Sequence, residues 1–169
     1  GGPGAINLSV NINTPTLPTY NGSSVVQGIA KSAYKQGDLF VNAAGNLNIE
    51  DPSPKTKHFR VIVGLDETEM RWDEGEGLGS IFGEFKAAAP SKLVPVVVPY
   101  GKTGVLYGTG TSYAAPSWAS CIALLMSLDP ALSAPQADKI VFNTATITAE
   151  GYHLPDLYNA VNTALELEP

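Results

Sequence analysis

The sequence from Gly108 to Pro116 reads Gly-Thr-Gly-Thr-Ser-Tyr-Ala-Ala-Pro, and an apolar run follows it to about Leu128. The closely spaced glycines predict a tight loop, and Ser112 stands where that loop becomes a helix. Apolar residues cover most of the circumference of the expected helix, so it should lie in the middle of a domain. Pro116 is interpreted as part of the helix's first turn, where a missing N–H is tolerated. This arrangement would present a small hydroxyl as a nucleophile at the positive end of a helix. The alternative is a serine that only caps the helix.

The rest of the chain alternates strands with helices. Residues 6–10 alternate apolar and polar side chains, as a half-buried strand does, whereas residues 39–44 are continuously apolar, as in a parallel sheet. The helix expected between them completes a right-handed strand–helix–strand unit. Strands are also expected at 60–65 and 85–89, a hairpin at 93–98 with 104–107, and helices at 25–36, 134–142 and 155–165. The predicted fold class is α/β, with a mainly parallel sheet, flanking helices and a buried central helix.

Composition narrows the classes of function. The chain has 169 residues, 44% hydrophobic and 15% charged, which is typical of a single folded domain with a large interior. A formal net charge of −6 argues against nucleic acid or an anionic membrane as a partner. No apolar run reaches membrane-spanning length. The single cysteine, Cys121, cannot form an internal disulfide and is expected to pack in the core.

Two stretches of the sequence resemble motifs of one protein family, and they occur in the order that the family has. Residues 110–116 resemble the nucleophile motif G-T-S-x-A-x-P of the subtilisin-like serine peptidases. Residues 40–46, which read F-V-N-A-A-G-N, are similar to the strand and turn that carry this family's oxyanion-hole asparagine. The resemblance covers nearly the whole chain but only the later half of the family's catalytic domain. It implies a serine endopeptidase that cleaves peptides or proteins through an acyl-enzyme, with Ser112 as nucleophile and Asn46 as oxyanion donor. For Asn46 the alternative is a turn residue.

The resemblance also implies a set of substrate-binding residues. They would form the walls of a pocket for a substrate side chain and its approach to the nucleophile, and they are Ser9, Val10, Asn11, Ala43, Ala44, Gly45, Gly110 and Thr111. Asn11 replaces a glycine that lets substrate backbone lie along the groove in the family. The alternative for the residues on the two walls is ordinary strand ends.

A serine hydroxyl needs a base to take its proton. The family's aspartate and histidine motifs, D-[ST]-G and H-G-T-H, do not occur in this sequence. The two histidines, His58 and His153, have neither the order nor the surroundings to replace them, and both are expected in loops. We therefore expect residues 1–169 to be a single partial domain, inactive alone, whose partner is the missing N-terminal half. The alternative is a non-catalytic peptide-binding or assembly module derived from the same fold.

The loop after residue 65 is rich in carboxylates: Asp66, Glu67, Glu69, Asp73, Glu74 and Glu76. Calcium is one interpretation, since some members of the family bind it. The spacing lacks the alternating pattern of a dedicated calcium loop, so a solvated acidic loop and no cofactor are favoured. The sequence leaves the cellular location open, and only the resemblance implies an extracellular one.

Strand 6–10 is expected to have an open edge, because the family's neighbouring strands belong to the missing half. An unpaired edge invites association, so we predict that the isolated chain forms a homodimer or aggregates through it, or that a rearranged segment covers it. Sedimentation checks this. A stable monomer in which the amides of Asn7 and Ser9 are protected from hydrogen exchange would contradict it.

Overall fold

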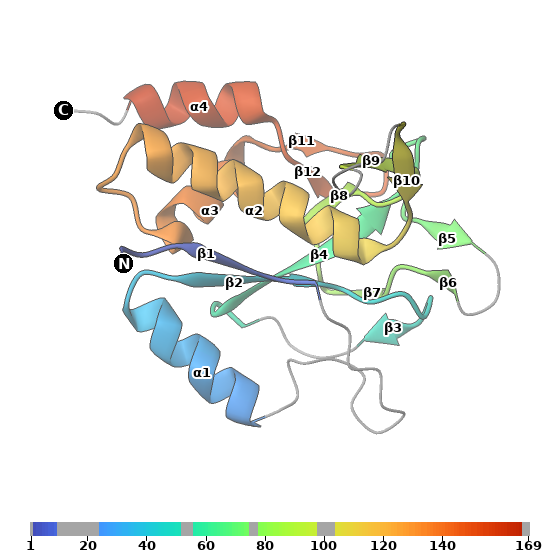
Figure 1. Ribbon diagram of the computed structural model, residues 1–169, viewed down its shortest axis with the longest axis horizontal. Coiled ribbons are helices and arrows are strands. Elements are labelled where there is room, and N and C mark those ends of the chain that lie inside the picture. The colour runs from blue at the N-terminus through green and yellow to red at the C-terminus, as the bar shows by residue number, and fades with distance from the viewer. Residues whose placement is uncertain (1, 10–23, 52–55, 75–77, 98–103, 167–169) are drawn as a thin grey trace.

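Four parallel strands form the central sheet. The computed structural model describes residues 2–9, 24–51, 56–74, 78–97 and 104–166. The sheet order is β1-β2-β4-β8, and each neighbouring pair is parallel (Figure 1). These strands are β1 (Ala5–Leu8), β2 (Leu39–Ala43), β4 (Phe59–Leu65) and β8 (Ala88–Pro90). The predicted α/β class with a mainly parallel sheet is therefore confirmed.

Helices cover both faces of this sheet. One face is covered by α1 (Ser24–Lys35), and the other by α2 (Thr111–Leu128), α3 (Ala134–Thr144) and α4 (Leu157–Glu166) (Figure 1). Because side chains alternate along each strand, the sheet divides the interior into two apolar clusters. Val41 and Ile62 point to the α2 side, whereas Phe40 and Val63 point to the α1 side.

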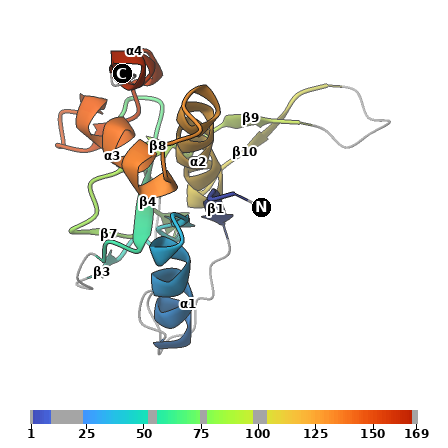
Figure 2. The same ribbon diagram turned by 90° about the vertical axis from the view of Figure 1, so that its left-hand side faces the viewer.

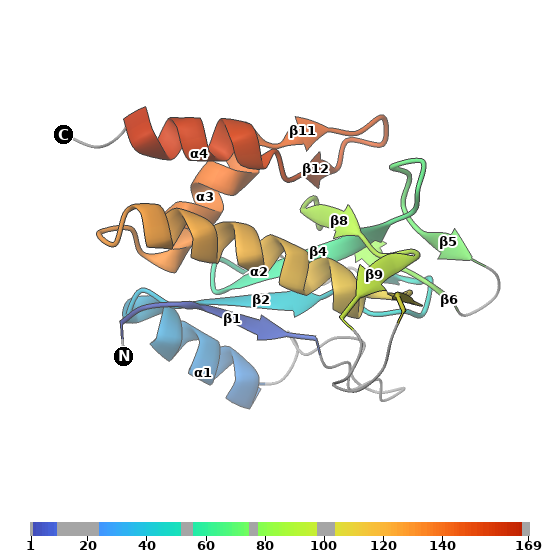
Figure 3. The same ribbon diagram turned by 45° about the horizontal axis from the view of Figure 1, so that its top comes forward.

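The helix α2 contacts every strand of the central sheet and two of the other helices. It packs on β1, β2, β4 and β8 and also contacts α3 and α4 (Figure 3). Trp118, Ile122 and Leu125 are fully buried in these contacts. Leu124 and Leu128 lie on the remaining flank and are 39% and 40% exposed. Cys121 packs against the apolar cluster as expected, and burial raises the pKa of its thiol.

Short strand pairs complete the structure. The expected hairpin is confirmed as an antiparallel pair that extends away from the body of the molecule (Figure 2). The other pairs, one parallel and two antiparallel, have strands of two residues, which is too short to leave a pattern in the sequence. In chain order the short strands are β3 (Glu50–Asp51), β5 (Asp73–Glu74), β6 (Leu78–Gly79), β7 (Phe82–Gly83), β9 (Val94–Val96), β10 (Leu106–Gly108), β11 (Thr146–Ile147) and β12 (His153–Leu154).

The sequence predicts where the helices begin better than it predicts which of their side chains are buried. A capping box between Ser133 and Gln136 starts α3 as predicted. On α1, by contrast, the apolar side chains of Val25 and Ile29 are 68% and 56% exposed. In α4 the small residues Ala160 and Ala164 are the buried ones, because they allow close approach of the neighbouring helices.

The outer side of β1 pairs with no strand among the residues described, so the expected open edge is present there. Association through it stays a prediction. No helix in the described ranges is both long and apolar enough to cross a membrane.

A buried ion pair ties the sheet to α2 and α3. Arg60 of β4 donates from Nε to Asp138 Oδ1 at 2.9 Å and from a terminal nitrogen to Oδ2 at 2.5 Å. The indole N–H of Trp118 donates to the same Oδ1 at 2.9 Å. The Arg60 guanidinium also lies 4.5 Å from the centre of the Phe142 ring. Asp138 is 6% exposed, so few waters can replace these partners.

We predict that Asp138→Ala lowers the free energy of unfolding by about 2–4 kcal/mol, because it leaves a buried indole N–H and a half-buried guanidinium without their acceptor. Asp138→Asn keeps an acceptor for Trp118 and should cost less. Urea denaturation followed by circular dichroism measures both. Equal costs for the two variants would contradict this prediction, because the acceptor that asparagine keeps for Trp118 would then contribute nothing.

Candidate active site

A tight loop leads into the helix that carries Ser112. Gly110 precedes α2 with φ +141°, a conformation that favours glycine. A Cβ at this position would lie 3.2 Å from Nδ2 of Asn46, so only a glycine leaves room for that side chain. The Gly110 N–H donates to the carbonyl of Ser91 at 2.7 Å, which fixes the loop against the end of β8. Ser112 is thus the second residue of a helix whose start is fixed by the hydrogen bond between Gly110 and Ser91.

The side chain of Asn46 joins the end of β2 to the start of α2. Its Oδ1 accepts hydrogen bonds from the N–H and the hydroxyl of Thr111, both at 2.9 Å. The Thr111 hydroxyl in turn accepts from the N–H of Gly45 at 3.0 Å. Thr111 is fully buried, and the Nδ2 amino group of Asn46 donates to no other described residue. The amide carbonyl is therefore fixed by Thr111, and the amino group lies next to Gly110, two residues before Ser112.

Ser9 and Ser112 exchange hydrogen bonds. The Ser112 hydroxyl donates to the carbonyl of Ser9 at 3.0 Å, and the Ser9 hydroxyl donates to the carbonyl of Ser112 at 3.0 Å. Pro116 is the sixth residue of α2 and lies beyond its first turn, so the interpretation of Pro116 as a first-turn residue is wrong. A proline there cannot bond the carbonyl four residues earlier, which is that of Ser112. The Ser9 hydroxyl supplies the missing donor.

The expected pocket walls are described only in part. Val10 and Asn11 lie outside the described residues. Ala43 and Ala44 are buried, the first in the apolar cluster on the α2 side and the second in the cluster on the α1 side. A contact between these alanines and substrate would therefore have to use their backbone. The substrate-binding role of the set stays a prediction.

Neither histidine lies at Ser112. His58 packs edge-on against Tyr34, with ring centres 5.3 Å apart. His153 stacks on Phe142 at 3.8 Å, and its Nδ1 lies 3.0 Å from that residue's carbonyl oxygen. It belongs to β12 and not to a loop, because its N–H pairs with the carbonyl of Lys86. Among the residues that the structure covers, no histidine or carboxylate bonds to the Ser112 hydroxyl.

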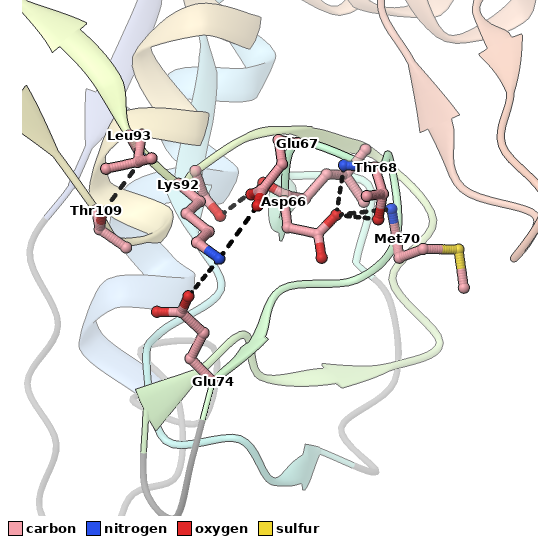
Figure 4. Close-up of polar contacts among 10 residues, drawn as sticks. Asp66, Glu67, Thr68, Met70, Glu74, Lys92, Leu93 and Thr109 are labelled. Atoms are coloured by element: carbon pink, nitrogen blue, oxygen red, sulfur yellow. Dashed lines mark hydrogen bonds and ion pairs between the residues drawn. The ribbon is translucent and has the colours of Figure 1, made fainter.

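A lysine from outside the acidic loop, Lys92 after β8, bonds two of the loop's carboxylates. Nζ of Lys92 lies 2.5 Å from Glu74 and 3.4 Å from Glu67 (Figure 4). The hydrogen bond from Lys92 lowers the pKa of the Glu74 carboxyl. These carboxylates stay exposed, at 60% for Glu67 and 44% for Glu74, so the loop is solvated and is also cross-linked by ion pairs.

The side chain of Asp66 stabilises the first turn of that loop. Its Oδ1 accepts from the N–H and the hydroxyl of Thr68, at 2.8 and 2.7 Å (Figure 4). Glu76 lies outside the described residues. Within the described ranges, no three histidine, cysteine or acidic side chains converge as metal ligands. Calcium binding remains untested.

No sequence pattern marked Ser9 as the partner of the Ser112 carbonyl, or Thr111 as the link between Gly45 and Asn46. The one available signal was Pro116 itself. A proline past the first helical turn leaves a carbonyl that needs another donor.

Comparisons with known proteins agree with the family resemblance and with the fold. A sequence model described as the subtilase family matches residues 76–164. A solved protease from Pseudoalteromonas arctica is 22% identical with a TM-score of 0.70, over 95% of this chain and 51% of that chain. The prenylagaramide maturation protease PagA is 19% identical with a TM-score of 0.71, over 94% of this chain and 61% of that one. The chain therefore spans only 51% and 61% of the length of these two structures.

We predict that Thr111→Val destabilises the chain by about 1–3 kcal/mol, because it leaves the buried Gly45 N–H without an acceptor. Thr111→Ser keeps the hydroxyl and loses one buried methyl group, worth about 0.8 kcal/mol. Urea unfolding of both variants tests the link. A valine variant as stable as the serine variant would mean that the hydroxyl contributes nothing.

Proposed function

The chain belongs to the subtilase family, and from that premise we propose that it supplies the nucleophile half of a serine endopeptidase active site. Ser112 would be acylated by the substrate, and Asn46 would stabilise the oxyanion. The observation that carries this proposal is the bonding of Asn46 to Thr111, the residue directly before Ser112. It fixes the side-chain amide of Asn46 against the residue that precedes the serine that would attack.

Two donors are available for the negative charge that forms on the attacked carbonyl oxygen. The first is Nδ2 of Asn46. The second is the backbone N–H of Ser112, which belongs to the first turn of α2 and has no carbonyl partner inside the helix. Donors held in this way need no reorganisation during the reaction, so their electrostatic stabilisation of the transition state is large.

The base must come from outside the described residues. At rest the Ser112 hydroxyl donates to the Ser9 carbonyl, which accepts a hydrogen bond but cannot take up the proton. We therefore assign the base and its orienting carboxylate to a further segment of the domain that packs beside β1. The open outer edge of β1 and the greater length of the solved relatives support this assignment. Substrates would be peptides or proteins.

A second candidate function is a non-catalytic peptide-binding module. The observation that favours it is the same open edge of β1, to which an extended peptide could add as a further strand. This function would not need the Ser112 hydroxyl. The two candidates therefore separate in an experiment on that residue.

A fluorophosphonate probe, which phosphonylates an activated serine with loss of fluoride, tests the proposal. We expect negligible labelling of the 169-residue chain alone. The same chain joined to a segment carrying D-[ST]-G and H-G-T-H motifs should be labelled stoichiometrically, and Ser112→Ala should abolish this. In the labelled form Asn46→Ala should lower kcat by about 10²–10³, a figure measured on a subtilisin donor of this kind.

Two outcomes would contradict the proposal. Rapid stoichiometric labelling of the chain alone would overturn the argument for a missing base. Labelling of the joined protein that persists in Ser112→Ala would place the nucleophile elsewhere.

A further inference from the structure

A pocket of about 420 Å³ opens at the amino ends of the strands, away from Ser112. Its walls come from α1, β2, β4, the segment before β8, and α3. Figure 2 looks onto this end of the molecule, with α1 and α3 on either side of β4. Strand β4 has seven residues, so roughly 20 Å of strand separates this end of the sheet from the other. The pocket is distinct from the candidate active site.

The inner surface of the pocket is apolar and aromatic. Phe59, Val61 and Phe85 line it and are buried. The rings of Tyr34 and Phe142 contribute from the two flanking helices. The volume falls in the range of about 300–1,000 Å³ that small-molecule sites occupy. An aromatic or aliphatic body of modest size therefore fits the interior.

Basic side chains gather around this apolar interior. The chain has a net charge of −6, yet four of its ten lysines and arginines line this one pocket. They are Lys57, Arg60, Lys86 and Lys139. The acidic residue in the described lining, Asp138, is bound by Arg60 and Trp118.

The three lysines are not neutralised by neighbours. Among the described residues, Lys57, Lys86 and Lys139 form no ion pair. The adjacent His58 is consistent with the resulting positive potential: burial, together with the charges of Lys57 and Lys31, lowers its pKa. An anion entering this region would meet cations whose charge is still available.

A buried hydroxyl in the lining also lacks a partner. The Oγ1 atom of Thr56 is buried and makes no hydrogen bond to any residue that the structure describes. Burying a hydroxyl without a partner is unfavourable, and native structures usually provide one. A polar group of a bound molecule would satisfy it.

We propose that this pocket binds a small organic anion, that is, an apolar body carrying one carboxylate or phosphate group. The body packs against Phe59 and Phe85, and the anionic group lies toward the lysines. Lysine ammonium groups act as compact point charges and accept either anion, since the Arg60 guanidinium is already held by Asp138. This inference does not depend on the proposed peptidase function.

Three probes with the same ring system test the charge requirement: 1-naphthoate, 1-naphthyl phosphate and the neutral 1-naphthylmethanol. Isothermal titration of the 169-residue chain should show at least one anion binding about tenfold more tightly than the alcohol, with a difference that shrinks as salt is raised. The anion that binds more tightly identifies the preferred group. Equal binding of all three probes, or no binding of either anion at millimolar concentration, would overturn the proposal.

Lysine variants locate the site. Lys57→Gln, Lys86→Gln and Lys139→Gln should each weaken anion binding by about twofold to fivefold, as expected for exposed charges. Lys92→Gln is the matched control, because it removes the same charge near the opposite end of the sheet, and it should leave the affinity within about twofold. Circular dichroism confirms that each variant is folded. Equal weakening by the control and the pocket variants would show that only net charge matters, and would reject this site.

Discussion

The hydrogen bonds between Asn46 and Thr111 are the constraint on which the candidate site depends. They join residues 65 positions apart in the sequence, one just after a strand and the other at the first position of a helix. Thr111 is fully buried, so water cannot take the place of Asn46 as its partner. The relative position of Asn46 and Ser112 is therefore set by how α2 packs on the sheet, and the loops on either side follow from it.

The exchange between Ser9 and Ser112 adds a second constraint from the neighbouring strand. A proline inside a helix costs about 3 kcal/mol or more, in part because one carbonyl loses its partner. Here that carbonyl belongs to Ser112 itself, and the Ser9 hydroxyl bonds to it from the end of β1. The packing of β1 beside α2 therefore offsets part of the cost of Pro116. The same arrangement holds the Ser112 hydroxyl on a carbonyl oxygen, which orients it without activating it.

The sequence was informative where a local pattern carries the structure. The buried strand at Leu39–Ala43, the capping box at Ser133 and the glycine before Thr111 each follow from a few adjacent residues. The partners of Asp138 and the contact of Ser9 with α2 could not be predicted, because they join distant segments whose side chains are common everywhere. The motif around Ser112 predicted which residues to look for, and the packing shows how they are held.

The two ends of the sheet differ in charge, and this separates what each can attract. Carboxylates such as Asp66 and Glu74 follow the carboxyl end of β4, whereas uncompensated lysines surround the pocket at its amino end. The field of exposed charges decays over about 8 Å at physiological salt, so two regions separated by the length of a strand act independently. The anion proposed for the pocket would therefore meet lysines there and mainly carboxylates beyond the carboxyl end of β4. Occupation of one site need not interfere with the other.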